Sequence, residues 1–296
     1  MNDLLNCCNL CPRKCSVNRN CGQKGFCAAG SKIKIAKAYL HKWEEPCISG
    51  NNGSGTIFFS HCNLRCIFCQ NYYISLDGNG VEISVDRFSE ICLDLQARGG
   101  ANINLVTSTH YIPLIIDGIK LAKANGLKIP IVYNSSGYEC ADTIRLLDGI
   151  VDVYLPDFKY YSNNYGKKYS VCNDYFKYAS GAIDEMFRQQ PKCVFDNNGN
   201  IVKGVIIRHL LLPNMENDSK RILKYLYDKY HNNVFYSIMN QYTPVKTYRY
   251  LELNRKIDNN VYDDVIDYAW KIGIRNAFIQ EGDTQSESFI PKWDFK

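Results

Sequence analysis

Beyond residue 50 the chain alternates short β-branched runs with helical periods, and this alternation constrains the fold most. The runs expected to form strands cover residues 55–60, 103–107, 129–134, 152–157, 204–212 and 234–239. Apolar residues recur at helical spacing in 88–95 and 222–230, the second with Asp218 or Ser219 as its expected N-cap. Apolar strands separated by helices predict a parallel sheet that is covered on its outer face. We therefore expect an α/β fold, a partial (β/α)6 barrel of the TIM type.

Polar stretches follow five of these strands: "SHC", "TSTHY", "NSSGY", "PDFKY" and "LPN". In parallel barrels the residues at the carboxyl ends of the strands carry the chemistry. We expect the five stretches to converge on one mouth. Glu185, Arg188 and Gln189 share one helical face, and this face and "MNQY" after the sixth strand are expected to point toward the same mouth.

The cysteine content indicates metal or cluster binding. The 296 residues include 14 cysteines, and the first residues lack the apolar region of a signal peptide. No run approaches the roughly 20 apolar residues of a membrane span, so we expect a cytoplasmic protein with no membrane partner. That compartment keeps thiols reduced, which argues against structural disulfides. The net charge of +5 is spread over interleaved acids and bases, and this argues against a nucleic-acid groove.

Three cysteines, Cys62, Cys66 and Cys69, lie on the loop that leaves the first predicted strand. A structural zinc ion, or a cluster that only transfers electrons, usually has four protein ligands. Three thiolates leave one metal position open, as in a [4Fe-4S] cluster with one free iron. Zinc with His61 as the fourth ligand is the alternative, although adjacent residues seldom chelate one ion.

A second group of cysteines lies within the first 27 residues. Four of them are spaced to close a site that could organise a segment with almost no core: Cys8, Cys11, Cys15 and Cys27. Cys7 and Cys21 are spare or alternative ligands. A closed structural zinc or iron site, an auxiliary Fe-S cluster and a nucleic-acid-binding zinc ribbon remain open, and the lack of interleaved aromatics argues against the ribbon. We predict a Cys-rich module at 1–45, a barrel at 46–273 and a C-terminal extension at 274–296 that covers part of the mouth.

The C-x3-C-x2-C spacing, with Phe68 directly before the last cysteine, resembles the radical S-adenosylmethionine (SAM) superfamily. Further stretches resemble its pyruvate formate-lyase-activating-enzyme-like (PflX-type) branch over nearly the whole chain. These are "CNLCPRKCSVNR", "GFC", "NINLVTSTHY", "YNSSGYE", "YLPDFKYY", "EMFRQQ", "IRHLLLPN" and "MNQYTP".

The resemblance implies a partial barrel of the radical SAM kind and an anaerobic oxidoreductase chemistry. The open iron would bind the amino and carboxylate groups of SAM, and one electron would split SAM into methionine and a 5′-deoxyadenosyl radical that abstracts a hydrogen atom from substrate. It also implies an electron donor such as flavodoxin or ferredoxin, and by default a glycyl radical enzyme as the protein to be activated. Radical modification of a small molecule or peptide is the first alternative, and a non-catalytic metal-binding protein is the second.

Contacts to SAM are implied residue by residue. Phe68 is suited to stacking near the adenine, although plain core packing is the simpler interpretation. Many members of the superfamily hold the SAM amino group with a Gly-Gly-Glu stretch, and this chain instead places Thr109 and His110 there. Either side chain could bind the amino group or be purely structural.

The stretches "NSSG" and "DFK" resemble motifs of the activating enzymes at the SAM carboxylate. On that basis Asn134, Ser135 and Asp157 would supply oxygens to a monovalent cation, and Lys159 or Arg208 would neutralise the carboxylate. Without the resemblance, Asp157 and Lys159 would be a same-face pair on a strand, which is most often structural.

Overall fold

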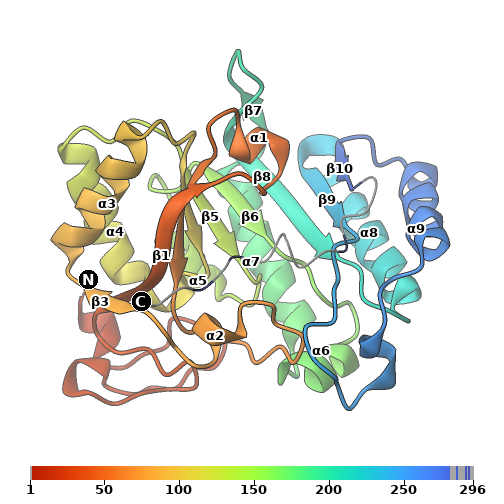
Figure 1. Ribbon diagram of the computed structural model, residues 1–296, viewed down its shortest axis with the longest axis horizontal. Coiled ribbons are helices and arrows are strands. Elements are labelled where there is room, and N and C mark those ends of the chain that lie inside the picture. Colours follow the sequence, from red (N-terminus) through yellow and green to blue (C-terminus); the bar gives the residue numbers. More distant parts are fainter. Residues whose placement is uncertain (1, 281–284, 286–290, 292, 294–296) are drawn as a thin grey trace.

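The computed structural model describes residues 2–280, 285, 291 and 293. Its strands, shown in Figure 1, are β1 (Ile33–His41), β2 (Ser54–Phe59), β3 (Val81–Ile83), β4 (Ile103–Val106), β5 (Ile131–Ser135), β6 (Val153–Pro156), β7 (Val194–Phe195), β8 (Ile201–Leu210), β9 (Phe235–Met239) and β10 (Ala277–Ile279). Its α-helices are α1 (Pro46–Ser49), α2 (Tyr72–Ser75), α3 (Val85–Ala97), α4 (Ile112–Ala124), α5 (Ala141–Arg145), α6 (Asn163–Ser170), α7 (Tyr175–Gln189), α8 (Glu216–Tyr230) and α9 (Asn259–Ile272). Short 3-10 helices cover Asn2–Leu5, Arg19–Cys21, Thr109–Tyr111, His231–Asn233 and Leu251–Asn254.

The sheet confirms the predicted parallel barrel. Its order is β10-β9-β8-β6-β5-β4-β2-β1-β3, with β7 paired to β8 outside this path. Every neighbouring pair from β10 to β2 is parallel, and the six predicted strands are β2, β4, β5, β6, β8 and β9. Sequence reasoning missed β1 and β3, which pair antiparallel at the β2 edge, and it missed β10 at the other edge.

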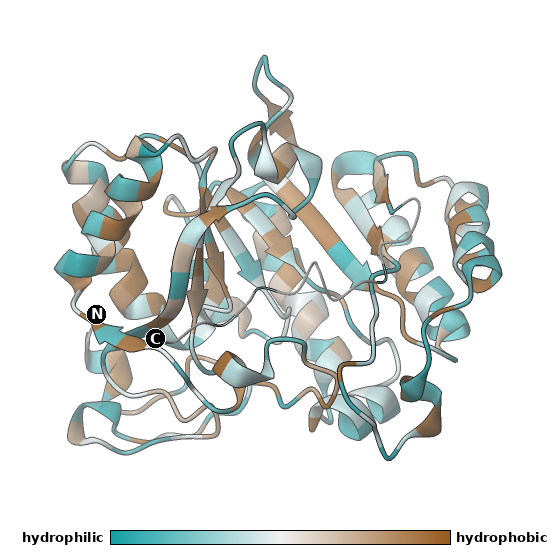
Figure 2. Ribbon diagram, viewed as in Figure 1, coloured by the Kyte–Doolittle hydropathy of each residue, from teal (hydrophilic) through white to brown (hydrophobic). Residues whose placement is uncertain are grey.

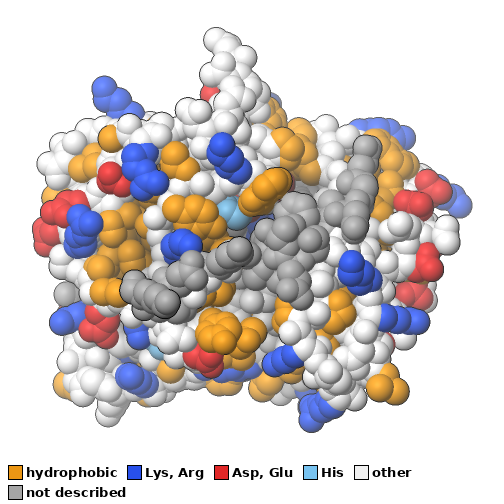
Figure 3. Space-filling model, in the orientation of Figure 1, with side chains coloured by type: hydrophobic (Ala, Val, Ile, Leu, Met, Phe, Trp, Pro, Cys, Tyr) orange, Lys and Arg blue, Asp and Glu red, His pale blue; other side chains and the backbone are white. Residues whose placement is uncertain are grey.

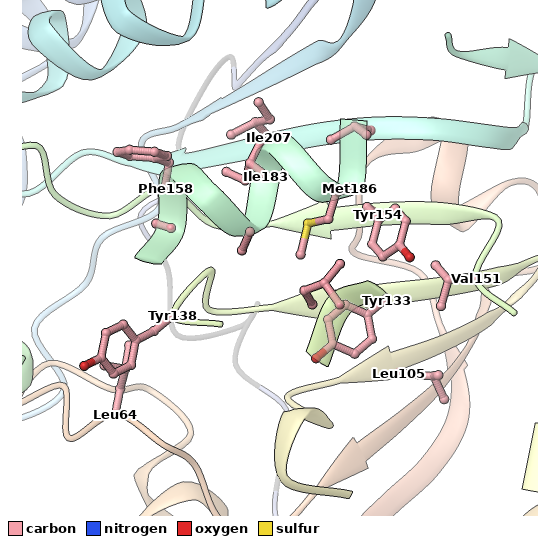
Figure 4. Packing of buried hydrophobic residues seen from close by; sticks show 14 of the residues in the cluster. Leu64, Leu105, Tyr133, Tyr138, Val151, Tyr154, Phe158, Ile183, Met186 and Ile207 are labelled. Carbon is pink, nitrogen blue, oxygen red and sulfur yellow. The ribbon is translucent and has the colours of Figure 1, made fainter. Parts of the chain in front are cut away.

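Helices cover the outer face of this curved sheet, because alternate strand residues point outward and are apolar. Figure 2 shows apolar strands at the centre and helices whose solvent side is polar. Figure 4 shows one part of this core, where Ile183 and Met186 of α7 lie against Tyr154 of β6 and Ile207 of β8. The outer core is therefore built mainly from aliphatic residues and tyrosines.

Inward-facing residues form a second, smaller core at the amino ends of the strands. Val132, Leu155 and Ile206 share it with Cys47 and Ile48 of α1. The chain therefore leaves β1, crosses the open side of the barrel and inserts α1 into the lumen before β2 begins. Two residues further along the same strands, the inward-facing residues are polar. The polar residues therefore lie closer to the carboxyl ends of the strands than this apolar core does.

The predicted N-cap of one helix needs correction. Helix α8 begins at Glu216 with Met215 as its N-cap, so neither Asp218 nor Ser219 caps it. The Asp218 carboxylate instead accepts hydrogen bonds from the backbone N–H groups of Tyr161 and Ser162, because the loop after β6 lies against the start of α8.

The predicted domain boundaries stay predictions. Residue 45 falls between β1 and α1, and both elements are packed with the barrel. Most of the predicted extension after residue 280 lies outside the described residues; of its described members, Pro291 lines a cavity and Trp293 packs edge-on against Phe58. No helix in the described part of the chain is long and apolar enough to cross a membrane.

Candidate active site

The three cysteines lie on the loop between β2 and α2, at the carboxyl end of the barrel. Each sulfur already has a polar neighbour. Ser170 Oγ donates to Cys66 Sγ at 2.9 Å, the Leu64 N–H donates to Cys62 Sγ at 3.4 Å, and Cys69 Sγ lies 3.2 Å from Ser75 Oγ. Hydrogen bonds to sulfur from the surroundings are what a metal-bound thiolate requires.

Burial dominates the electrostatic surroundings of two of these thiols. Burial raises the pKa of Cys62 to about 12 and of Cys66 to about 11, and the neighbouring thiols raise both, while Lys159 acts in the opposite direction. Thiols with such pKa values become thiolates when a metal replaces the proton. Among the described residues no three Cys, His, Asp or Glu side chains converge on a single-ion position. A cluster needs no such convergence, because its thiolates bind different irons.

A cavity of about 240 Å³ adjoins the cysteine loop. Cys66, Phe68 and Cys69 line it on the loop side, and the Phe68 ring meets the Tyr242 ring edge-on at 6.2 Å between centroids. Phe68 is buried and lies directly before Cys69 in this wall. Its stacking on adenine stays a prediction.

Another part of the wall of this cavity is a partly buried polar layer. Asp157 pairs with Lys159 at 2.5 Å and with Arg208 at 3.0 Å. Arg208 also donates to Asn134 Oδ1 at 2.6 Å. Burial alone would raise the pKa of Asp157, but the two cations outweigh it and hold that pKa below its ordinary value. The strand-end residues predicted from "NSSG", "DFK" and "IRH" therefore do meet at one place.

Ser135 does not join this layer. Its hydroxyl accepts from the Gly137 N–H at 3.2 Å, so it serves the turn after β5. The Arg208 guanidinium lies where the predicted monovalent cation would need oxygens from Asn134 and Asp157. The cation stays a prediction that no contact among these residues supports.

Thr109 and His110 point away from the cavity. The 3-10 turn Thr109–Tyr111 directs the Thr109 hydroxyl to Glu139 Oε1 at 2.6 Å, and His110 Nε2 lies 2.8 Å from the Ser60 carbonyl. Both side chains are buried. Burial lowers the pKa of His110 to about 3, which keeps the ring neutral. In this arrangement both residues are structural, which was one of the two interpretations left open.

Sequence reasoning missed Glu44, which is central to the site. It enters the lumen from the segment between β1 and α1, and its carboxylate accepts from Asn104 at 3.0 Å and pairs with Arg208 at 3.2 Å. Burial raises the pKa of Glu44, while Arg208 opposes this effect. Two adjacent glutamates before a proline look like a surface turn, so no signal in the sequence marked them as buried.

The predicted helical face of "DEMFRQQ" is not part of the site. Arg188 pairs with Glu185 at 2.8 Å and with Asp148 at 2.7 Å, and the Arg188 side chain is 53% exposed. By contrast Gln241 of "MNQY" lines the cavity beside the cysteine loop. The expectation was thus right for the strand end and wrong for the helix, whose apolar face packs on the sheet.

The N-terminal cysteines lie near one another. The pKa of the Cys27 thiol is raised by its burial first, and the charges of Cys8 and Cys15 add to the effect. Cys8 and Cys27 similarly act on Cys11. Arg19, which is 1% exposed, lies with Nη1 3.8 Å from Cys8 Sγ and donates to the His110 carbonyl at 2.6 Å. The donor set suits a zinc ion or a cluster, although among the described residues no three metal-binding side chains yet converge on one position.

This module packs directly against the cysteine loop. The Phe26 ring lies between two guanidinium groups, with the Arg13 carbon 3.7 Å and the Arg65 carbon 4.7 Å from its centroid. Arg13 also donates to the Asn63 carbonyl at 2.9 Å, and Arg65 donates to the Phe26 carbonyl. Since Asn63 and Arg65 lie between Cys62 and Cys66, the module fixes the shape of that loop.

Comparisons with known proteins agree with this geometry. Residues 56–195 match the family model of the Radical SAM superfamily. The chain is 28% identical over 276 residues to the uncharacterized protein MJ0674 of Methanocaldococcus jannaschii, covering 90% of this chain and 75% of that protein.

Among solved structures, SuiB of Streptococcus suis bound to S-adenosylmethionine is similar with a TM-score of 0.51 and 12% identity, over 80% of this chain and 51% of SuiB. Methylornithine synthase gives a TM-score of 0.49 and 14% identity, over 72% of this chain and 59% of that one. The chain thus spans between about half and three fifths of these two structures. The similarity to SuiB supports the fold. The family match, together with the cysteine loop at the end of β2, shows that residues 56–195 form a radical SAM superfamily domain.

Proposed function

We propose that this protein is a radical SAM enzyme whose [4Fe-4S] cluster is held by Cys62, Cys66 and Cys69. The observation that carries the proposal is the placement of three half-buried thiols on one loop, two of which, Cys66 and Cys69, line a cavity that is also lined by the partly buried Asp157, Lys159 and Arg208. These three cysteines would hold the cluster, which would supply the single electron needed for the reductive cleavage of SAM to methionine and a 5′-deoxyadenosyl radical that abstracts hydrogen from substrate. The cavity wall formed by Phe68 and Tyr242 keeps water from that radical.

Lys159 and Arg208 are the residues proposed to bind the SAM carboxylate. Both lie in the cavity wall and both already pair with Asp157, which orients them. Asp157→Ala and Lys159→Ala should each weaken SAM affinity by roughly 1 to 3 kcal/mol, the usual range for a charge-assisted contact. Equilibrium binding of SAM to anaerobically reconstituted protein measures this. Wild-type affinity in both variants would remove these residues from the SAM site.

A glycyl radical enzyme is the default candidate for the substrate, because the "NSSG" and "DFK" stretches resemble those of activating enzymes. A flavodoxin or ferredoxin would supply the electron. Freeze-quenched electron paramagnetic resonance of the reduced protein with SAM and the host's glycyl radical enzymes tests this candidate. A persistent glycine-centred doublet supports it, and SAM cleavage without that signal from any candidate partner excludes it.

A small molecule or peptide is the second candidate, and the lumen favours it. Trp43 and Glu44, from the segment between β1 and α1, form part of the cavity wall, which leaves less room for the loop of a large partner.

For the N-terminal thiols we propose an auxiliary Fe-S cluster or a closed zinc site, in line with their donor set. Metal analysis of a variant that lacks Cys62, Cys66 and Cys69 separates the two. Residual iron with equal acid-labile sulfide indicates a cluster, and zinc without sulfide indicates a structural ion. If that variant contained neither iron nor zinc, the barrel cluster would be the metal site of the wild-type protein and the N-terminal thiols would bind none.

A further inference from the structure

A larger cavity, of about 540 Å³, adjoins the polar layer on its far side. It shares Trp43, Glu44 and Arg208 with the cavity at the cysteine loop. Its other walls combine Glu45 with apolar side chains of β10, among them Phe278. A ligand in this space therefore lies next to the proposed SAM site.

The ionisable groups around the two cavities do not balance. Among the described residues that line them, three carboxylates, of Glu44, Glu45 and Asp157, face two cations, Lys159 and Arg208. Both cations form ion pairs with other carboxylates. Lys159 and Arg208 pair with Asp157, and Arg208 also pairs with Glu44. Glu44 has Asn104 and Asn134 as additional donors. Within the described part of the chain, Glu45 is the one of these three carboxylates that makes no ion pair, although the charge of Arg208 acts on it from a greater distance.

The carboxylate of Glu45 has an unused hydrogen-bonding position that a ligand could fill. It is 9% exposed, and its buried Oε2 has no hydrogen-bond partner among the described residues. Ser237 offers its carboxylate a hydrogen bond. Burial raises the pKa of Glu45, and Arg208 opposes this effect, as any further cation beside it would. Native proteins rarely leave a buried carboxylate oxygen unpaired, so this one requires a partner.

We propose that the 540 Å³ cavity binds a substrate that carries a protonated amine on an aliphatic chain, with Glu45 as the counter-charge. This inference rests on the radical SAM function proposed above and names the substrate class of the same site. The apolar wall of β10 accommodates the aliphatic part. An ammonium group supplies the positive charge and the hydrogen-bond donors that Glu45 lacks.

Other ligand classes fit less well. A divalent metal ion would need several converging ligands, and no group of three metal-binding side chains converges within the part of the chain that the structure describes. An anionic substrate would add to the excess of negative charge. The neighbouring amides are already engaged with each other, since Gln280 Nε2 donates to Gln241 Oε1 at 3.0 Å, so they orient a ligand without neutralising Glu45.

Three probes of equal length test the proposal: n-pentylamine, n-pentanol and pentanoate. Binding to anaerobically reconstituted protein with SAM present is followed by tryptophan fluorescence, because Trp43 lines the cavity. We expect pentylamine to bind at least about tenfold more tightly than either other probe, as a charge-assisted contact provides. Equal affinity for the amine and the alcohol would overturn the proposal, and this comparison needs no variant.

Glu45→Gln supplies the second arm. It should reduce pentylamine affinity about tenfold or more and leave that of pentanol unchanged. Because it removes an unpaired buried charge, it should also raise the Tm of the ligand-free protein by roughly 2 °C or more. A merely structural glutamate would give the opposite Tm change. Glu44→Gln, which removes a carboxylate with three donors, should lower the Tm, and Glu82→Gln on the exposed strand β3 should alter neither quantity.

Failure of this proposal is distinguishable from failure of the proposed function. Wild-type protein that cleaves SAM to 5′-deoxyadenosine but does not prefer the amine retains the function and loses the substrate class. Protein that prefers the amine in a Glu45-dependent way but never cleaves SAM retains the binding site and loses the radical chemistry. Amine affinity that survives Glu45→Gln would place the amine elsewhere and overturn the assignment.

Discussion

Replacing Arg208 tests the polar layer at its centre. Its guanidinium contacts Asp157 at 3.0 Å, Glu44 at 3.2 Å and Asn134 at 2.6 Å, and its side chain is 16% exposed. Arg208→Met keeps most of the side-chain length but leaves Glu44 with its two amide donors and Asp157 with Lys159. Removing one member of a buried ion pair typically destabilises a protein by about 3 to 5 kcal/mol, because the remaining charge stays buried. We expect a loss in that range in the free energy of unfolding.

Arg87→Met is the matched control. Arg87 pairs with Glu90 at 2.7 Å, but the two side chains are 61% and 63% exposed, so the same substitution should change stability by at most about 1 kcal/mol. Urea unfolding followed by circular dichroism, on anaerobically reconstituted proteins, measures both variants. Adding Glu44→Gln to Arg208→Met should restore part of the loss, since it removes one of the carboxylates that lost its cation. Equal, small losses for Arg208→Met and Arg87→Met would refute the buried ion-pair layer.

Three further predictions follow from local geometry. Gly137→Ala should abolish stable folding or SAM binding, because Gly137 has a φ of +76° and a Cβ there would collide with the Asp157 carbonyl. Gly199 has a similar φ of +80° but open space around it, so Gly199→Ala should lower the free energy of unfolding by only about 1 kcal/mol. Equal Tm values for the two variants would contradict the close approach at Gly137. Cys11→Ala should expose residues 2–32 to limited proteolysis while β1 and the barrel stay protected, and unchanged protection of this segment would argue against a metal-organised module. Burial raises the pKa of Glu139 to about 7, even though hydrogen bonds from Thr109 and Tyr133 act in the opposite direction. The wild-type protein should therefore lose stability as the pH rises through that value. Glu139→Gln should remove about 2 kcal/mol of this loss between pH 5.5 and 8, measured by urea unfolding, and parallel pH profiles would count against the raised pKa.

The parallel strands and the polar strand ends could be predicted from the sequence because both depend on local patterns. Inward positions along each strand change from apolar to polar within two residues, from Leu155 to Asp157 and from Ile206 to Arg208. Side chains alternate between the two faces of a strand, and the carboxyl ends of parallel barrel strands lie together. These two regularities place such residues at one mouth. Figure 3 shows Lys and Arg side chains scattered over one face, in agreement with the interleaved charges of the sequence.

The missed features depend on long-range packing. Strand β1 is at an antiparallel edge, and the segment after it enters a lumen that exists only once the barrel has formed, so nothing local marks Glu44 as buried. Thr109 was placed at the mouth because it follows β4, but a 3-10 turn directs its hydroxyl to Glu139. The turn that follows a strand sets the direction of the next side chains. The position of a residue after a strand does not by itself predict that direction.

Cleavage of SAM by the reconstituted protein tests the central claim most directly. Anaerobically reconstituted wild-type protein, reduced with dithionite and given SAM, should form methionine and 5′-deoxyadenosine. A variant with alanine at Cys62, Cys66 and Cys69, but with the N-terminal cysteines intact, should form neither product and should lack the barrel cluster by iron and sulfide analysis. Undiminished 5′-deoxyadenosine from that variant, or none from wild-type protein that holds its full cluster, would contradict the account.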